Sequence, residues 1–582
     1  QRYEHQPFIS CLAGFYSCRW KRYQRRRTEP GQCCCKMWEC LFFPFLIGAF
    51  CLSLVFLYMW GEAKNDYINF DWYHYGNVGH WFLWSVFLLI VAAVLFTYVT
   101  LLLVLAVCLL SESQQLDLHW SHKIGTLVVL AFSIAGITVF SKLWKVRWKV
   151  VRLSFQVTAP YLHVGAIAAM VLLSWPVALH AFRMDAQIKW HRERFSRHHP
   201  AFECKCLLPH HLPNIFQAII IGPYLAILVL LFLVPLGMYS PCIRELGTLG
   251  PKPALLGHRG APMLAPENTE MSFQKTIEHR GDGLESDVAI SYDGIPFLMH
   301  DKNLKRTTNI REVFPDNITQ NPAFFSWDAL EKLNAGKWFL KDKPFSCMGS
   351  LSSADQKLAK NQSIYKLSNF LRLADSASKL VIFDLYRPPE KHPYRHTWIY
   401  RTLEVILDSK INPHLVLWLD NNLRSYIQST IPGFQHITGG KAPVEELLRR
   451  NIFKRNLAYS VMSSEDIRKY AQANITTNFY VISEPWLFSL AWCAGAHSVT
   501  TNTIHILKNI NRPLFLMTPK EYRVMWLLTD VVAALLISLI FAFHWWREKG
   551  LACCADNSGA VLENGTYNKF RTELNDLPMV VA

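Results

Sequence analysis

The chain has 582 residues, of which 51% are hydrophobic, 13% aromatic and 18% charged. A charged fraction below the roughly 25% of soluble domains, with so many apolar residues, favours a soluble domain joined to a membrane region. The same composition excludes intrinsic disorder, a collagen and a small disulfide scaffold. The formal net charge of +16 at pH 7 indicates affinity for anions, but its meaning depends on where the charges lie.

Six stretches approach or exceed the roughly 20 mainly apolar residues that a membrane-spanning helix needs. They are Leu41–Trp60, Trp81–Leu110, Ile124–Phe140, Tyr161–Phe182, Ile215–Leu236 and Met525–Phe543. Buried helices of a large soluble protein are the alternative, but so many apolar stretches would leave too little polar surface for a soluble fold. The sequence therefore predicts five transmembrane helices with their loops over 41–240 and a sixth over 525–545.

Basic residues near these stretches predict which side of the membrane each loop occupies. The N-terminal tail, residues 1–40, and the loop after the fourth stretch are both rich in Lys and Arg, so both are expected in the cytosol. Five crossings then place 240–522 outside, and the sixth returns the tail at 546–582 to the cytosol. The basic segment Lys142–Arg152 disagrees with this arrangement, because it would lie outside.

Cysteine clusters and basic residues beside the membrane stretches predict contacts with lipid. The clustered cysteines expected in the cytosol include Cys33, Cys34, Cys35, Cys204, Cys206, Cys553 and Cys554. Such clusters are typical of S-palmitoylation, and the alternative of zinc binding lacks Cys and His at the usual ligand spacing. The run Arg25–Arg27 is expected to contact anionic lipids of the inner leaflet. Nucleic acid is not an expected partner, because the basic residues are divided among several loops.

The region placed outside carries the signs of a secretory environment. Its N-glycosylation sequons begin at Asn317, Asn361 and Asn474, whereas Asn564 lies in the predicted cytosolic tail and is expected to stay unmodified. Its cysteines are Cys242, Cys347 and Cys493. An odd number allows one disulfide with a thiol left over. A plasma-membrane or secretory-pathway location is expected.

The residues from 252 to 512 alternate between short apolar stretches and helical patterns. The candidate strands are Ala254–Gly257, Leu284–Ile290, Leu380–Leu385, His414–Leu419, Gln435–Thr438, Asn456–Ser460, Asn478–Ile482 and Ser498–Thr501. Alternation of this kind predicts a parallel sheet with crossover helices, and eight units of this length fit a (β/α)8 barrel. A doubly wound open sheet is the alternative. Residues 310–365 are predicted to form an insertion.

Charged side chains gather where these predicted strands end. His258 and Arg259 follow the first strand, and His300 follows the segment after the second. Glu285 and Asp287 lie two residues apart on the second strand, so both project to the same face. The carboxyl ends of barrel strands build the active site, so these residues are expected to meet there.

This set of residue types suits hydrolysis of a phosphodiester. Carboxylate oxygens select Ca²⁺ or Mg²⁺, which offset phosphate charge and polarise the P–O bond. Arg259 can hold phosphate oxygens through two parallel hydrogen bonds. Two histidines can divide the work of general base and general acid near neutral pH.

The same residues carry a resemblance to a known family. The matching motifs are His258-Arg259-Gly260, Pro266-Glu267-Asn268-Thr269, Glu285-x-Asp287, Asp293-Gly294 and His300-Asp301 with Leu304, Arg306, Thr307 and Thr308. Together, in this order, they resemble the glycerophosphodiester phosphodiesterases. With the six predicted helices, nearly the whole chain resembles the six-transmembrane branch of that family. The resemblance implies a barrel that uses a divalent cation to split glycerophosphodiesters into a glycerol phosphate and an alcohol.

The resemblance also implies roles for single residues. His258 and His300 match the family's catalytic pair, and Arg259 matches its phosphate-binding arginine. Glu285 and Asp287 match metal ligands.

Other positions depart from the family or stay ambiguous. Glu267 matches an acid at or next to the metal. Asp384 and Tyr386 stand where the family has a Glu-x-Lys, and Asp384 is either a further metal ligand or a helix cap. Tyr480 keeps an aromatic residue in the expected substrate pocket. Arg306 either pairs with an acid or contacts phosphate.

The first functional hypothesis is a membrane-tethered metal-dependent glycerophosphodiesterase. Its expected partners are membrane lipids and a glycerophosphodiester or lipid-derived substrate, and the sequence indicates no oligomeric state. The alternative is a non-catalytic signalling or scaffold protein that retains the barrel, because the third and seventh strands are altered. A transporter is disfavoured, since the apolar stretches lack paired buried charges and broken-helix repeats.

Overall fold

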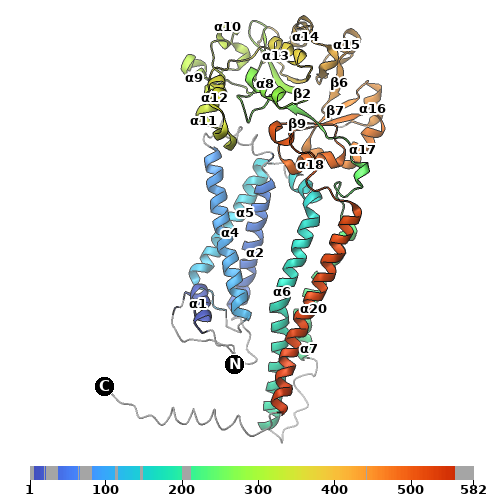
Figure 1. Cartoon of the computed structure of the whole chain (residues 1–582). Coiled ribbons are helices and arrows are strands. Elements are labelled where there is room, and N and C mark those ends of the chain that lie inside the picture. Colours follow the sequence, from blue (N-terminus) through green and yellow to red (C-terminus); the bar gives the residue numbers. More distant parts are fainter. Residues whose placement is uncertain are drawn as a thin grey trace, which may run out of the picture.

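The computed structural model consists of a barrel set on one end of a group of long helices (Figure 1). It describes residues 6–18, 20, 37–62, 65, 81–111, 116–144, 149–198, 212–440 and 442–557. The long helices are α2 (Met37–Glu62), α4 (Trp81–Ser111), α5 (Trp120–Trp144), α6 (Lys149–His198), α7 (Leu212–Gly237) and α20 (Pro519–Asn557). A short helix, α1 (Gln6–Ser17), lies at the end of these helices that is remote from the barrel (Figure 1).

Five of the described helices are long and apolar enough to cross a membrane. Their spans are Phe42–Glu62, Val86–Leu109, Trp120–Val139, Lys149–Leu179 and Pro519–Arg547. The remaining predicted stretch lies in α7, which contributes the shorter apolar segment Ile221–Gly237. Large apolar side chains such as Leu172 (77% exposed) and Leu539 (65% exposed) face outward. Such residues favour lipid as the surrounding medium, because helices that are apolar all round are not stable on the surface of a soluble domain.

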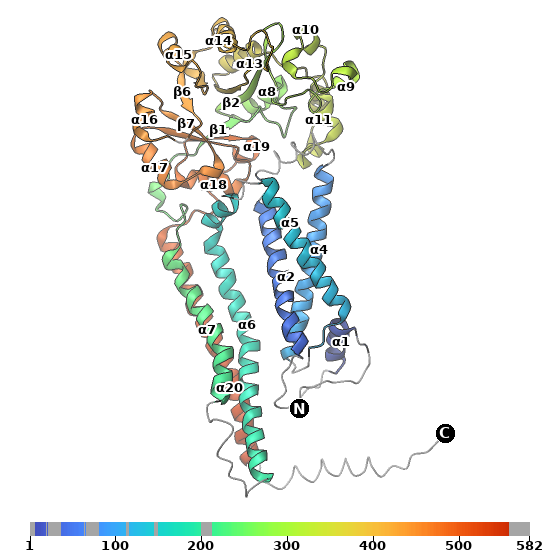
Figure 2. The same ribbon diagram turned by 180° about the vertical axis from the view of Figure 1, so that it is seen from behind.

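The membrane helices form two groups beneath the barrel (Figures 1 and 2). In the first group α2, α4 and α5 pack around Leu46, Val99 and Val129. In the second, α6, α7 and α20 pack around Met170 and Tyr224. Close packing of apolar side chains thus holds each group together.

Several predictions for the cytosolic side fall outside the described residues. They concern the basic run Arg25–Arg27, the cysteines Cys33, Cys34, Cys35, Cys204 and Cys206, and the sequon at Asn564. The helix α20 includes Cys553 and Cys554, but the structure does not describe their side chains. S-palmitoylation and contacts with the inner leaflet therefore stay predictions.

The domain above the helices is a closed barrel of eight parallel strands. They are β1 (Ala254–Gly257), β2 (Gly283–Ile290), β4 (Leu380–Leu385), β5 (Val416–Trp418), β6 (Gln435–Thr438), β7 (Lys454–Ala458), β8 (Thr476–Tyr480) and β9 (Ser498–Thr501). The barrel closes because β1 pairs in parallel with both β2 and β9. This confirms the predicted (β/α)8 fold and excludes the open sheet. The short strand β3 (Pro296–Leu298), which the sequence did not suggest, extends β2 in antiparallel fashion.

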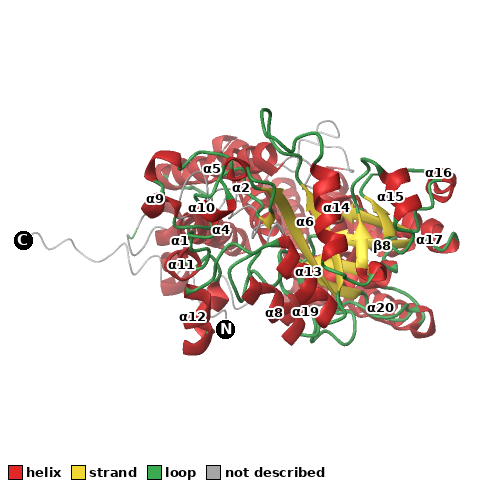
Figure 3. Ribbon diagram, turned by 90° about the horizontal axis from the view of Figure 1, so that it is seen from above, coloured by secondary structure: helices red, strands yellow, loops and turns green. Residues whose placement is uncertain are grey.

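Helices follow the strands and cover the outside of the barrel (Figure 3). They are α8 (Glu270–Glu278), α13 (Leu367–Ser376), α14 (Trp398–Asp408), α15 (Arg424–Thr430), α16 (Val444–Arg449), α17 (Ser464–Gln472), α18 (Pro485–Ala494) and α19 (Ile504–Leu507). Most bury one face, whereas α18 buries residues on every side. The reason is that α18 lies between the barrel and the membrane helices, where Phe488 shares one apolar cluster with Trp60 of α2 and Leu153 of α6.

The segment between β3 and α13 contains four short α-helices at one side of the barrel (Figure 3). They are α9 (Ile310–Val313), α10 (Trp327–Leu330), α11 (Lys337–Asp342) and α12 (Ser353–Lys360). Part of this segment has an apolar core of its own, which includes Trp327, Leu330 and Leu333. The same core takes in Phe297 of β3, so the segment is fixed to the barrel.

A disulfide between Cys242 and Cys493 ties the end of the second membrane group to the barrel. Cys242 follows α7 and Cys493 lies in α18, 251 residues away. Cys347 is the free thiol of the region. This pattern agrees with the expectation of one disulfide and one thiol left over.

We expect Cys493→Ser to destabilise the barrel by about 2–4 kcal/mol, because the crosslink restricts a long loop in the unfolded chain. The melting temperature of the oxidised full-length chain in detergent should then fall by roughly 5–10 °C. Cys347→Ser is the matched control and should leave the melting temperature unchanged. Equal melting temperatures for the two variants would contradict this role of the disulfide.

Candidate active site

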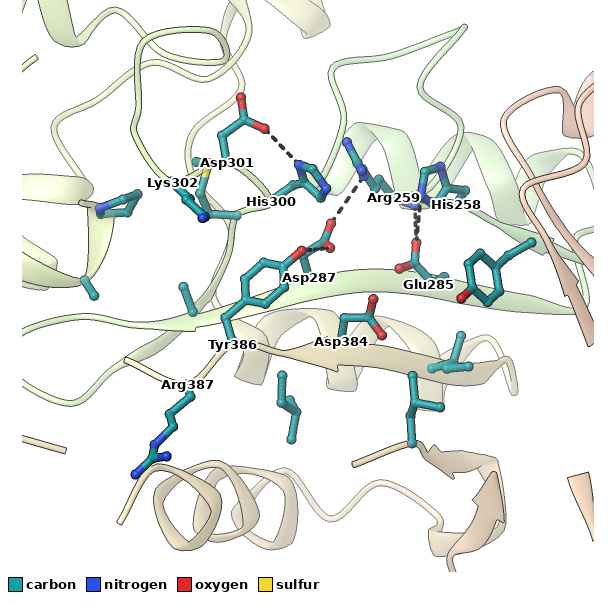
Figure 4. A pocket seen from close by; sticks show the side chains of 18 of the residues that line it. His258, Arg259, Glu285, Asp287, His300, Asp301, Lys302, Asp384, Tyr386 and Arg387 are labelled. Carbon is teal, nitrogen blue, oxygen red and sulfur yellow. Dashed lines mark hydrogen bonds and ion pairs between the residues drawn. The ribbon is translucent and has the colours of Figure 1, made fainter. Parts of the chain in front are cut away.

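Three carboxylates converge at the carboxyl ends of neighbouring strands. Asp287 of β2 and Asp384 of β4 are register partners on adjacent parallel strands, so their side chains leave the sheet side by side. Glu285 projects to the same face of β2 as Asp287. One oxygen from each of the three acids lies within 4.8 Å of the others (Figure 4). The arrangement places oxygen ligands around one point, as Ca²⁺ and Mg²⁺ require.

The electrostatics of the three acids favour a bound cation. Burial and the nearby charge of Asp287 raise the pKa of Asp384 to about 6. Burial and the same neighbour raise the pKa of Glu285 well above its ordinary value. Asp287 is also buried, but its pKa is lowered, chiefly by the Arg259 guanidinium. The site thus holds more negative charge than its own cations balance, and a divalent ion would satisfy all three carboxylates.

Arg259 joins the acids to the end of β1. Its backbone N–H donates to Glu285 Oε2 at 2.9 Å, and its guanidinium Nε lies 3.3 Å from Asp287 Oδ2. The residue has a left-handed backbone with φ of 55°, which is uncommon outside glycine and favours functional positions. This conformation lets the main chain and the side chain of one residue hold two different carboxylates.

Glu267 lies behind Arg259 and is held by two guanidinium groups. Arg306 donates to both of its oxygens, at 2.7 and 2.6 Å, and Arg259 donates to Oε1 at 3.3 Å. Its carboxylate lies outside the group formed by Glu285, Asp287 and Asp384. The two guanidiniums lower the pKa of Glu267 although burial alone would raise it. Of the two alternatives for Arg306, the structure therefore places it in ion pairs with acids.

His258 is buried at the end of β1, with its ring held from β9. Its Nδ1 lies 2.7 Å from Asn502 Oδ1, and its Nε2 lies 3.9 Å from Glu285 Oε2. An amide oxygen accepts hydrogen bonds, so Nδ1 carries the proton and Nε2 keeps its lone pair. Burial and the neighbouring Arg259 charge lower the pKa of His258 to about 3. The ring is therefore neutral and can accept a proton at Nε2.

His300 lies on the opposite side of the acids and has a different partner. Its Nδ1 donates to Asp301 Oδ1 at 2.8 Å, and its side chain is 40% exposed. Asp301 in turn accepts hydrogen bonds from Arg306. Burial alone would raise the pKa of the Asp301 carboxyl, but the positive charge of Arg306 lowers it. The two histidines thus differ in burial and in the partner of Nδ1, which is an amide oxygen for His258 and a carboxylate for His300.

Two further residues hold Asp287 in place. The Tyr386 hydroxyl donates to Asp287 Oδ1 at 2.7 Å, and Asn268 Nδ2 donates to Oδ2 at 3.2 Å. Tyr386 therefore supplies a donor where the family has a lysine, whereas Arg387 points away from the acids (Figure 4). Asp384 belongs to β4 and not to a helix end, so the cap interpretation is wrong.

A cavity of about 1340 Å³ opens above these residues. The predicted residues that line it are His258, Arg259, Glu285, Asp287, His300, Asp384 and Tyr480. Arg311 and Asn321 of the segment between β3 and β4 form part of the wall. Lys302 and Lys305 add positive charge near His300, which favours an anionic ligand.

Sequence reasoning missed Asn502 and the positioning contacts of Asn268 and Tyr386. A polar residue directly after a predicted strand is the available signal for Asn502, which follows β9. Asn268 was noticed as part of a motif, but its bond to Asp287 depends on a turn that brings the two residues together.

Comparison with known proteins places this geometry in a family. Residues 258–434 match the model of the glycerophosphoryl diester phosphodiesterase family. Glycerophosphodiester phosphodiesterase domain-containing protein 4 of Mus musculus is 44% identical over 99% of this chain and 91% of its own length. Domain-containing protein 5 of Homo sapiens is 43% identical over 95% of this chain and 86% of its own.

A third relative is named for its activity. It is glycerophosphoinositol inositolphosphodiesterase GDPD2 of Homo sapiens, 39% identical over 91% of this chain and 92% of its own length. These similarities extend over both the membrane helices and the barrel. The chain belongs to the glycerophosphodiester phosphodiesterase family of enzymes.

Proposed function

We propose that the chain is a membrane-tethered, cation-dependent phosphodiesterase that hydrolyses glycerophosphodiesters or lipid-derived head groups to a phosphomonoester and an alcohol. The observation that carries the proposal is the convergence of three carboxylates, an arginine and two histidines in one cavity. Membership of a phosphodiesterase family supports the same reaction class.

The cation would be held by Glu285, Asp287 and Asp384, whose oxygens fit Ca²⁺ or Mg²⁺. When bound, it would neutralise phosphate charge and polarise the P–O bond. Arg259 lies beside these acids and can donate to phosphate oxygens from the same side of the cavity. Glu267 then acts behind Arg259 as a positioning residue, since it binds the guanidinium and not the substrate.

Proton transfers are divided between the two histidines. His258 Nε2 takes a proton from the attacking water as the water oxygen bonds to phosphorus. The bond from phosphorus to the alcohol oxygen breaks, and the protonated His300 gives its Nε2 proton to that oxygen. The buried neutral ring of His258 and the carboxylate beside His300 support this assignment. The reaction consumes one water and leaves the proton count unchanged.

The phosphate can depart with glycerol or with the other alcohol. The name of the inositolphosphodiesterase relative describes release of the phosphate with inositol. The assay should therefore use glycerophosphoinositol and glycerophosphocholine, and it should measure glycerol phosphate, inositol phosphate and phosphocholine together. Turnover of either substrate supports the proposal, whereas a well-folded, metal-loaded chain that releases none of these products contradicts it.

Glu285→Gln is expected to weaken cation binding and hydrolysis together, because it removes one of three converging charges. Mutation of a residue that only supports a metal ligand typically lowers activity by roughly 10- to 100-fold. Because Glu285 is itself a proposed ligand, we expect a larger loss in kcat/KM. Metal content of the purified chain and titration of Mg²⁺ or Ca²⁺ into it measure binding without turnover. Glu278→Gln, an exposed acid on α8, is the control. Unchanged metal affinity in Glu285→Gln would contradict this site.

His258→Ala and His300→Ala should each lower kcat by about 10²–10⁴-fold. A substrate with a p-nitrophenol leaving group separates the two roles, because this alcohol leaves without protonation. We expect the defect of His300→Ala to shrink on that substrate and the defect of His258→Ala to persist. His414→Ala, an exposed histidine outside the cavity lining, is the control. The assignment of acid and base is wrong if both defects change in parallel.

The proposed orientation places the barrel on the outer or lumenal side and both termini in the cytosol. All three sequons of the barrel, at Asn317, Asn361 and Asn474, are exposed and accessible to modification. Treatment of the cell-expressed chain with peptide N-glycosidase should increase its gel mobility. The triple Asn→Gln variant should lose that shift, and Asn564→Gln should keep it. A shift that disappears only with Asn564→Gln would reverse the orientation.

A further inference from the structure

Asn65 lies just beyond the first membrane helix and contacts the wall of the candidate active site. It lies three residues beyond the end of α2, and its side chain is fully buried, with 0% exposed. Its Nδ2 donates to Val481 O at 2.9 Å, and its Oδ1 accepts from the backbone N–H groups of Ser483 at 2.7 Å and Glu484 at 3.2 Å. One amide group thus binds three backbone groups of a single loop.

That loop joins β8 to α18 and begins at the wall of the cavity. Tyr480 and Val481 line the cavity. The loop is also held by the end of β9, since Ile482 N–H donates to Thr500 O at 2.9 Å. Thr503 Oγ1 also donates to Ser483 O, at 2.6 Å. The loop is therefore fixed between a membrane segment and a barrel strand.

The same strand end carries the residue that orients His258. Asn502, between the two loop contacts Thr500 and Thr503, accepts from His258 Nδ1 at 2.7 Å. The contacts of Asn65 are thus one loop away from the ring of a proposed catalytic histidine. A buried amide whose donor and acceptor are both used fixes position more firmly than apolar packing, because misplacement would leave buried polar groups unpaired.

Apolar packing joins the same parts of the molecule. Phe56 and Trp60 of α2 belong to one cluster with Leu487 and Phe488 of α18 and with Ile482 of the loop. Packing of this kind brings the two elements together but is not directional. The hydrogen bonds of Asn65 are directional and are made to named backbone groups of the loop.

We infer that Asn65 is a positioning residue of the active site, through which a membrane segment sets the place of the cavity wall at Tyr480 and Val481. The membrane helices then contribute to substrate binding and do more than anchor the barrel. This inference rests on the proposed hydrolysis for its kinetic consequence, but its structural consequence at Ser483 and Glu484 is independent of turnover.

The test uses the full-length chain in detergent with Asn65→Ala, which loses all three bonds, and Asn65→Asp, which keeps the two acceptor bonds. We expect KM for a glycerophosphodiester to rise about 10- to 100-fold in Asn65→Ala and by a smaller factor in Asn65→Asp. Hydrogen–deuterium exchange at the Ser483 and Glu484 amides should accelerate in Asn65→Ala. Asn412→Ala is the control: Asn412 also accepts a backbone N–H, but it is exposed and lies before β5, at the opposite end of the strands.

The outcomes separate positioning from folding. A fall in kcat at unchanged KM, with exchange like that of the wild type, would mean fewer folded molecules and would overturn the inference. Wild-type KM and wild-type exchange in Asn65→Ala would overturn it as well. If the wild-type chain hydrolyses no substrate, the proposed function fails, and the exchange of the Ser483 and Glu484 amides still decides the role of Asn65.

Discussion

Mutual repulsion among three converging carboxylates is the constraint on which the site depends. Strand register places Asp287 beside Asp384, and the two-residue period of a strand adds Glu285 to the same face. Like charges so close are costly unless cations and donors balance them. Nearby residues serve that need: Arg259 holds two of the acids, and Tyr386 donates to one. A bound divalent ion would complete the balance.

The neighbouring charges form an alternating chain that links the acids to His300. Asp287 contacts Arg259, which contacts Glu267; Glu267 contacts Arg306, which contacts Asp301 beside the His300 ring. Each link stabilises the charged form of its neighbours, so the position of one member depends on the next. The chain joins these motif residues in one connected network. Glu267 belongs to it as the partner of two guanidinium groups and lies outside the group formed by Glu285, Asp287 and Asp384.

The sequence predicted much of the barrel and the principal residues of the site, because both follow local rules. The strands β1, β4, β6 and β9 begin and end where apolar runs and turns place them. The strand β7 begins two residues earlier than predicted. An arginine is expected on the surface, but Arg455 is buried in the structure, where Tyr470 of α17 packs against it. The roles of Asn502 and Asn65 were not predicted, for a related reason. Their partners lie hundreds of residues away, so no spacing pattern could reveal them.

The membrane helices contact the barrel at one particular part of its surface. Among the residues that the structure describes, the membrane helices α2 and α6 meet the barrel at the segments that follow β7 and β8. These segments leave the carboxyl ends of the strands, where the cavity opens. Tyr459 illustrates the consequence, because it lines the cavity and also belongs to the apolar cluster that contains Leu153 of α6. The wall of the cavity is therefore in direct contact with the apolar cluster of the membrane helices, so the packing of these helices bears on the shape of the cavity.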